Sequence, residues 1–340
     1  MTRELTQREQ EVLREVVHDF ILTANPVGSK FIAQKTDLNL SPATIRNVMA
    51  HLEESGYLSH PHTSAGRVPT DKGYRFYLDT LMALESLEED ERAQIAAGLN
   101  SALDSSELLS DASKLLGKVS KQLSIVSAPY LGDATLTKIE LMSLNASKVL
   151  VVISLETGLI KTIVLEVESE VGIQRLKRIN SLLNERLAGL KLSEIRETIS
   201  ERVSDYTGED VINRFALMSD KIFASMPETD KFHIGVPQGL LSHPEFELPG
   251  NFRGILEILG DENVILHILE KGDKDEPVTV KVGSENTEEK LKDYSLITAR
   301  YAVGDVIGTV GVVGPRRMQY SRLIPLVDFV AKVISNKLNS

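Results

Sequence analysis

Residues 41–75 constrain the fold of this chain more than any other stretch, because they carry one helix from its start to its end. Serine followed by proline, Ser41-Pro42, is a typical helix start. Apolar side chains then recur at helical spacing, at Ile45, Val48, Met49 and Leu52. The pair Ser55-Gly56 is a typical helix end. The sequence therefore predicts a short helix with one buried face.

The opposite face of this helix is polar and short-chained. Arg46 and Asn47 lie there between two alanines, with Thr44 at the edge. Arginine suits the guanine edge and asparagine the adenine edge in a DNA major groove. We therefore predict that both residues read bases. The alternative is an ordinary surface helix, because short motifs have many false positives.

A polar hairpin is predicted directly after this helix. Residues 57–69 hold a short strand and then a polar run that contains Gly66, so this segment cannot be core. Arg67, with Lys72 and Arg75 behind it, is predicted to contact phosphates or the minor groove. The complete predicted DNA-binding set is Ser41, Thr44, Arg46, Asn47, His62, Thr63, Ser64, Arg67, Lys72 and Arg75.

Two more helices are predicted before this one, and a fourth after the hairpin. A capping box at Thr6 and Glu9 starts the first helix. The second spans residues 30–35 and is expected to turn Phe31 inward. The fourth begins at Thr70. Three short helices followed by a hairpin is the order of a winged helix-turn-helix.

The pattern changes twice downstream of an acidic run at residues 85–91, which we interpret as a domain boundary. Strand-like runs joined by short turns, hence antiparallel, come first, and a helical pattern follows at residues 171–224. Two β blocks flanking a helical block indicate one sheet domain that carries an insertion. The predicted strands are 136–144, 148–155, 159–167, 264–269, 278–282, 296–303 and 306–313.

Composition narrows the classes of function. The chain has 340 residues, no cysteine and a net charge of −11, so contact with nucleic acid must be focal. The N-terminus is charged, and no apolar run approaches the ~18–20 residues of a membrane span, so we expect a cytoplasmic protein with no membrane contact.

No motif predicts a metal, a cofactor or catalysis. His60 and His62 could share one strand face as metal ligands, but a zinc site needs three or four ligands and no cysteine or nearby acid completes one. The run Gly304–Gly308 precedes a strand rather than a helix, so it is not a dinucleotide loop. We expect no cofactor, no metal and no enzyme, although an active site assembled from distant segments would leave no local signal.

Several motifs resemble those of the HrcA family of heat-inducible transcription repressors. Two lie in the first eighty residues, at Ser41–Asn47 and Pro61–Arg75. Three lie later, at Leu240–Phe246, Gly283–Asn286 and Gly314–Ser321. The resemblance spans nearly the full length, and residues 231–238 depart most from the family pattern.

The resemblance implies an α+β multidomain fold. Its parts are a winged helix at 1–84, a linker helix at 85–104, a GAF-like antiparallel-sheet domain at 105–170 and 264–340, and an inserted, largely helical dimerisation domain at 171–263. It further implies a homodimer that binds double-stranded DNA at the CIRCE inverted repeat and represses chaperone operons. A GroEL-type chaperonin would keep it active, and heat would release repression. The alternative is a winged-helix regulator whose GAF-like domain senses a small molecule.

We predict that the helical insertion makes the dimer. Its helices carry more apolar positions than a thin helical layer can bury in one subunit, and monomers rarely expose a patch of that size. The alternative is that these positions form the insertion's own core. They are Leu176, Ile179, Leu183, Ile199, Phe215 and Met218.

Overall fold

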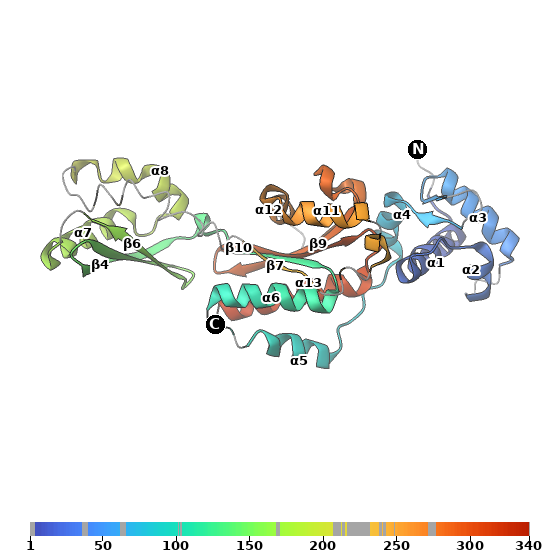
Figure 1. Cartoon of the computed structure of the whole chain (residues 1–340), viewed down its shortest axis with the longest axis horizontal. Coiled ribbons are helices and arrows are strands. Elements are labelled where there is room, and N and C mark those ends of the chain that lie inside the picture. The colour runs from blue at the N-terminus through green and yellow to red at the C-terminus, as the bar shows by residue number, and fades with distance from the viewer. Residues whose placement is uncertain are drawn as a thin grey trace.

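A computed structural model of the chain has three parts in a row along its long axis (Figure 1). We call them the head (residues 4–81), the central body, built on a five-stranded sheet, and the distal body, built on a three-stranded sheet. No helix of the described residues is long and apolar enough to cross a membrane. The described residues are 4–35, 40–61, 66–100, 102, 104–167, 171–206, 212, 215, 232–237, 240, 243–247, 249–270 and 277–339.

The head consists of four helices and a small hairpin, in the predicted order. The predicted caps are confirmed, because Thr6 forms a capping box and the Ser41 and Thr70 hydroxyls accept from the backbone of Thr44 and Gly73. Its elements are α1 (Gln7–Thr23), α2 (Ser29–Lys35), α3 (Pro42–Glu54), β1 (Leu58–Ser59), β2 (Val68–Pro69), α4 (Asp71–Phe76) and a π-helical turn η1 (Tyr77–Leu81).

One prediction in the head is wrong. Ile32 of α2 is fully buried, but Phe31 is 46% exposed rather than inward. A seven-residue helix buries only a narrow face, and Phe31 lies outside it. The ring instead lies 5.6 Å from the Lys35 ammonium, one turn along the same helix.

The central body is an antiparallel sheet with the strand order β7-β3-β10-β9-β8. The predicted hairpin is confirmed, since Val306 pairs with Val303 across a two-residue turn. Helices α6 and α13 pack on one face and α11 and α12 on the other (Figure 1). Its elements are α5 (Glu89–Gly98), α6 (Ser105–Ser120), β3 (Leu123–Ser127), β7 (Phe232–Gly235), η6 (Pro244–Glu247), α11 (Pro249–Leu259), α12 (Glu262–Glu270), β8 (Val278–Val282), η7 (Gly283–Glu285), η8 (Glu289–Leu291), β9 (Tyr294–Val303), β10 (Val306–Pro315) and α13 (Tyr320–Leu338).

The predicted strand at residues 264–269 is a helix, α12. The Asp261 carboxylate accepts from the backbone N–H groups of Asn263 and Val264, which caps the helix start. A run that is apolar at nearly every position fits a buried strand or a buried helix equally well. The cap signal at Asp261 is the feature that distinguishes them here.

The distal body is a separate sheet rather than an extension of the central one. Strands β4, β5 and β6 pair only with one another among the described residues, and α7 packs against β4. The chain leaves the central sheet after Ser127 and re-enters it at Phe232, and these two residues are paired partners. The elements are η2 (Leu131–Asp133), β4 (Leu136–Asn145), β5 (Lys148–Leu155), β6 (Ile160–Glu166), α7 (Ile173–Leu187), α8 (Leu192–Arg202) and η3 (Ser204–Tyr206).

This pairing differs from the expected division at 171–263. The strands at 136–167 belong to the inserted part, whereas β7 and α11 belong to the central body. Short turns showed that β4, β5 and β6 pair with each other. The turns do not indicate whether these three strands extend the central sheet or form a sheet of their own.

Two asparagines of α7 close the outer edge of β4. Asn180 accepts from the Leu141 N–H at 2.8 Å and donates to its carbonyl at 3.2 Å. Asn184 does the same with Ile139, at 2.9 and 2.7 Å. Each amide therefore replaces the partner strand that an edge residue lacks.

The apolar positions expected at a dimer contact are mostly core of one chain. Leu176, Ile179, Leu183, Ile199 and Phe215 are all buried within the single subunit, and Met218 lies outside the described residues. The specific reason for placing the dimer on the helices is therefore wrong. Four exposed apolar side chains of the distal body, Met142, Leu144, Ile160 and Val164, lie on its sheet strands, and Ile173 lies on α7.

Candidate nucleic-acid interface

Helix α3 presents its polar face to solvent because its other face anchors the head. Ile45, Met49 and Leu52 are buried in the core that α3 shares with α1 and α2. This fixes the rotation of the helix about its axis. Arg46 and Asn47 are exposed, as predicted, and neither side chain has a hydrogen bond or ion pair with any described residue.

The start of α3 adds two hydroxyls beside this face. Ser41 accepts from the Thr44 backbone at 3.1 Å, and the two hydroxyls lie 2.9 Å apart. Helix N-termini attract phosphate through their unpaired N–H groups and dipole. Ser41, Thr44, Arg46 and Asn47 thus lie on the first two turns of one helix, as predicted.

The hairpin after α3 is pinned to the head through its backbone. Strand β1 pairs with β2, and Arg67 exchanges two backbone hydrogen bonds of 2.9 Å with Val27. Gly66 permits this approach, since a Cβ there would lie 2.4 Å from the Val27 carbonyl. The predicted wing residues His62, Thr63 and Ser64 lie outside the described residues.

The cations predicted behind the wing all have partners. The Arg67 Nε lies 2.8 Å from the Glu53 carboxylate, and its side chain is only 16% exposed. Lys72 donates to the Ser55 carbonyl at 2.9 Å and lies 4.2 Å above the Tyr57 ring. Both therefore hold the end of α3 against the hairpin.

Arg75 faces the central body rather than open solvent. Its Nε donates to Glu285 at 2.7 Å, and an Nη donates to the Val280 carbonyl at 2.7 Å. The hydrogen bond with Glu285 is the main reason that the pKa of Arg75 is raised. Sequence reasoning missed Glu53 and Glu285, which hold Arg67 and Arg75.

A cavity of about 510 Å³ lies between the head and the central body. Tyr74, Arg316 and Arg317 are among its lining residues. The Tyr74 hydroxyl is buried and has no hydrogen-bond partner among the described residues. Burial raises its pKa well above the ordinary value, so it is neutral at physiological pH.

Of the two histidines considered as metal ligands, only His60 lies among the described residues. Its ring contacts the Glu53 carboxylate, which also faces Arg67. No group of three or more potential ligands (histidine, cysteine, aspartate, glutamate) occurs among the described residues.

Comparison with known proteins identifies the family. A family model described as the HrcA protein C terminal domain matches residues 106–324. The chain is 38% identical to the heat-inducible transcription repressor HrcA of Chlorobium phaeobacteroides (strain BS1), with all of both chains covered. It is 39% identical to the HrcA of Chlorobium chlorochromatii (strain CaD3), covering 99% of this chain and 98% of that one.

A solved structure shares the fold. It is described as a crystal structure of a hypothetical protein at 2.2 Å resolution, and it superposes with a TM-score of 0.63 at 23% identity over 99% of each chain. The mixed α/β architecture with antiparallel sheets is therefore one that has been observed by experiment. With full-length relatives and a matching domain model, this chain belongs to the HrcA family of heat-inducible transcription repressors.

Proposed function

We propose that this protein is a sequence-specific repressor of heat-shock genes, and that its head is a winged helix that reads DNA with α3. The names of the relatives support the function. The observation that carries the site is the exposed face of α3, where Arg46 and Asn47 lack internal partners among the described residues. Their side chains are the types that pair bidentately with guanine and adenine.

The rest of the predicted set is assigned to the DNA backbone, except Arg75, which Glu285 and the Val280 carbonyl of the central body hold. Ser41 and Thr44 lie at the start of α3, where phosphates bind. We assign the wing residues, Arg67 and Lys72 to phosphates on either side. Arg67 and Lys72 hold intramolecular partners, so each must exchange a carboxylate or carbonyl for a phosphate on binding.

We further propose that a homodimer binds an inverted repeat, the CIRCE operator. One small head on a chain of net charge −11 has few cations with which to hold an operator alone. Two linked heads gain affinity through effective concentration, and a two-fold dimer requires a two-fold DNA site.

The open face of the distal sheet is the proposed dimer contact. The strand register places the side chains of this face next to one another across the strands, because Met142 pairs with Leu150 and Leu150 with Val164. Exposure reaches 68% at Ile160 and 53% at Leu144. A second copy is the occupant that fits, because an isologous contact places the same apolar patch on both sides. The apolar members are Met142, Leu144, Leu150, Val152, Ile160 and Val164.

The dimer is tested by charge substitution on this face. Ile160→Lys with Val164→Glu should give a monomer by sedimentation, because two desolvated charges oppose burial. Ile173→Lys is the matched control, since Ile173 is 71% exposed on α7. A mutant that remains dimeric, or a control that dissociates, would place the contact elsewhere.

The function is tested by footprinting the purified protein on DNA upstream of chaperone genes. Protection of an inverted repeat, with and without a GroEL-type chaperonin, is the expected result. Increased protection when chaperonin is added would support the proposed partner, and its loss on heating would support chaperonin titration. Protection of no specific site would contradict the repressor assignment.

Small-molecule sensing is the second candidate, and one observation favours it. The cavity between head and central body contains the unpartnered Tyr74 hydroxyl, among the described residues. A ligand there would contact both parts. Operator affinity that responds to a metabolite pool but not to chaperonin would favour this candidate.

A further inference from the structure

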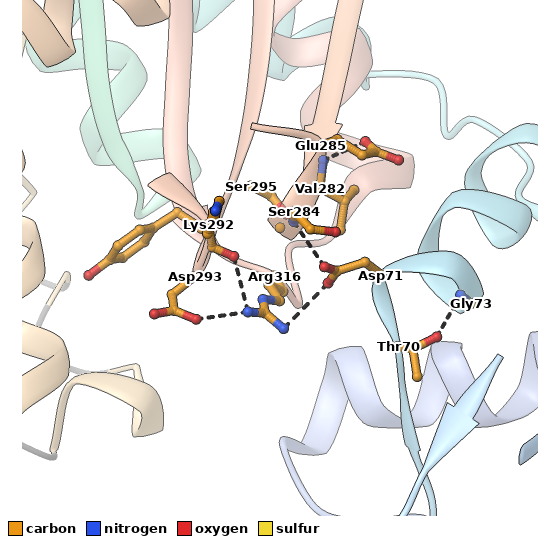
Figure 2. A network of polar contacts seen from close by, with 12 residues as sticks. Thr70, Asp71, Gly73, Val282, Ser284, Glu285, Lys292, Asp293, Ser295 and Arg316 are labelled. Carbon is orange, nitrogen blue, oxygen red and sulfur yellow. Dashed lines mark hydrogen bonds and ion pairs between the residues drawn. The ribbon is translucent and has the colours of Figure 1, made fainter. Parts of the chain in front are cut away.

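One face of α4 is joined to the central body by ionic contacts (Figure 2). The Asp71 carboxylate accepts from the Ser284 backbone at 2.9 Å and lies 3.4 Å from an Nη of Arg316. Arg316 is itself held, because it donates to Asp293 at 2.7 Å and to the Lys292 carbonyl at 3.0 Å. Asp71 therefore meets a donor set that the central body has already fixed in place.

Arg75, one turn further along α4, makes the second connection. It donates to both carboxylate oxygens of Glu285, at 2.7 Å through Nε, and to the Val280 carbonyl. Glu285 also accepts from the Val282 backbone at 2.8 Å, so its position is set by the turn that contains it. A bidentate arginine–carboxylate pair fixes angle as well as distance.

The turn that receives Asp71 depends on glycine. Gly283 has a φ of +53°, and a Cβ there would lie 2.3 Å from the Asp71 carboxylate. A side chain at this position would displace the Asp71 carboxylate from its contacts with Ser284 and Arg316. Three of the sequence motifs, Pro61–Arg75, Gly283–Asn286 and Gly314–Ser321, thus meet at one junction.

Helix α4 is in turn bonded to the residues that follow the C-terminal end of α3. The Thr70 hydroxyl donates to the Gly56 carbonyl at 2.7 Å, and Lys72 donates to the Ser55 carbonyl. Gly73 lets α4 pack closely there, since a Cβ at this position would lie 2.2 Å from the backbone carbonyl oxygen of Tyr57. Whatever sets the angle of α4 therefore sets the angle of α3.

We propose that Asp71, Arg75, Ser284, Glu285 and Arg316 form a latch that positions α3 relative to the body of the repressor. This inference rests on the proposed function, since it assumes DNA binding by a dimer. A recognition helix on a rigid mount meets both halves of an inverted repeat only at one half-site spacing. The latch residues of the central body are positioning residues that touch no base and no phosphate.

The inference predicts a split between two DNA affinities. Opening the latch leaves each head intact, so the affinity for a single half-site is unchanged. Affinity for the full inverted repeat should fall at least about tenfold, because the second head loses its effective concentration. A role in folding alone would reduce both affinities together.

Glu285→Gln and Arg316→Gln are the variants of choice, because both positions lie outside the predicted DNA-binding set. Gly283→Ala opens the latch sterically, and Gly189→Ala is its matched control. Gly189 also has a positive φ, +84°, but a Cβ added there would meet nothing within 4 Å. Binding constants are measured on the full repeat, one half-site and a random duplex, and thermal unfolding verifies that each variant is folded.

Head position is also measured without DNA. The chain has no cysteine, so spin labels at Gln7→Cys and Asp305→Cys, on labelled chains diluted with unlabelled ones, report the head-to-body distance within one chain. The wild type should give one narrow distance distribution, and Glu285→Gln and Gly283→Ala should broaden it, whereas Gly189→Ala should not. Narrow distributions in the latch variants would overturn the inference whatever the DNA results.

The DNA results have two further outcomes that contradict the latch. Full-repeat affinity that equals the wild type in all variants would show that position is set elsewhere. Tighter half-site binding by Glu285→Gln, with a steeper salt dependence, would show that Arg75 is a phosphate contact masked by Glu285. A wild type that fails to prefer the repeat over random DNA would contradict the proposed function instead, and the distance measurement still decides the latch.

Discussion

Two arginines of the head illustrate opposite uses of the same side chain. Arg46 on α3 is exposed and has no partner among the described residues. Arg75 on α4 is held by Glu285 and a carbonyl of the central body. Both lie in a motif-rich stretch of a DNA-binding protein, and sequence reasoning assigned both to DNA. The difference shows that residue type and sequence neighbourhood do not decide whether an arginine side chain is exposed or held inside the fold.

The largest expected effect concerns the buried side of α3. Ile45→Ala should lower the free energy of unfolding by ~2–5 kcal/mol, because it removes a fully buried side chain from the core of the head. Thermal or denaturant unfolding measures this change. Specific and random DNA binding should weaken together, and unfolding unchanged from the wild type would contradict the packing of α3 against α1 and α2.

The neighbouring residue should behave in the opposite way. If its side chain contacts base edges as proposed, Arg46→Ala should weaken binding to the specific site by ~1–3 kcal/mol. Unfolding should be unchanged, because Arg46 is exposed and has no partner among the described residues. Titration of specific and random duplexes measures the difference. Equal weakening on both duplexes would show that Arg46 contacts DNA phosphates. Arg46 and Arg75 would then differ only in whether the side chain is free to bind a phosphate.

Ser41 should affect both stability and DNA binding, because it caps α3 and lies beside the face that we propose contacts DNA. Ser41→Ala should cost about 1 kcal/mol of stability through loss of the cap. Ser41→Asp restores the cap but adds a negative charge next to phosphate, so it should recover stability and not DNA affinity. Recovery of both by Ser41→Asp would remove Ser41 from the interface.

Arg67 is the intermediate case, since Glu53 of its own head holds it. If Arg67 transfers to a phosphate, Arg67→Ala should lower the log–log salt slope of binding by about 0.9. Binding measured from low to moderate salt gives the slope. An unchanged slope would place Arg67 with Arg75 among the structural cations.

Local signals in the sequence are reliable wherever cause and effect lie close along the chain. The caps at Thr6, Ser41 and Thr70 each involve a backbone N–H three residues ahead, so the motif contains its own partner. The buried stripe of α3 follows from spacing alone. Together the cap and the stripe are sufficient to locate the exposed face with Arg46 and Asn47.

The contacts of Arg75 and the separate distal sheet depend on partners that lie far away in sequence. Glu285 is 210 residues from Arg75, and no sequence pattern around Arg75 predicts that the two side chains meet. In the same way, the strands at 136–167 show that they pair with one another but not that they form a sheet of their own. Neither fact follows from residue type or spacing, because each depends on how distant segments meet.

The hydrogen bonds from the α7 asparagines to β4 limit how many copies of the chain can assemble through the distal sheet. Asn180 and Asn184 occupy the backbone groups through which another strand would add to that side of the distal sheet. Among the described strands of this sheet, only β6, at the other side, remains to accept one. Any growth of this sheet by strand addition therefore ends after a single neighbour. An assembly built around it is expected to keep the same size over a wide range of protein concentration rather than lengthen into fibres.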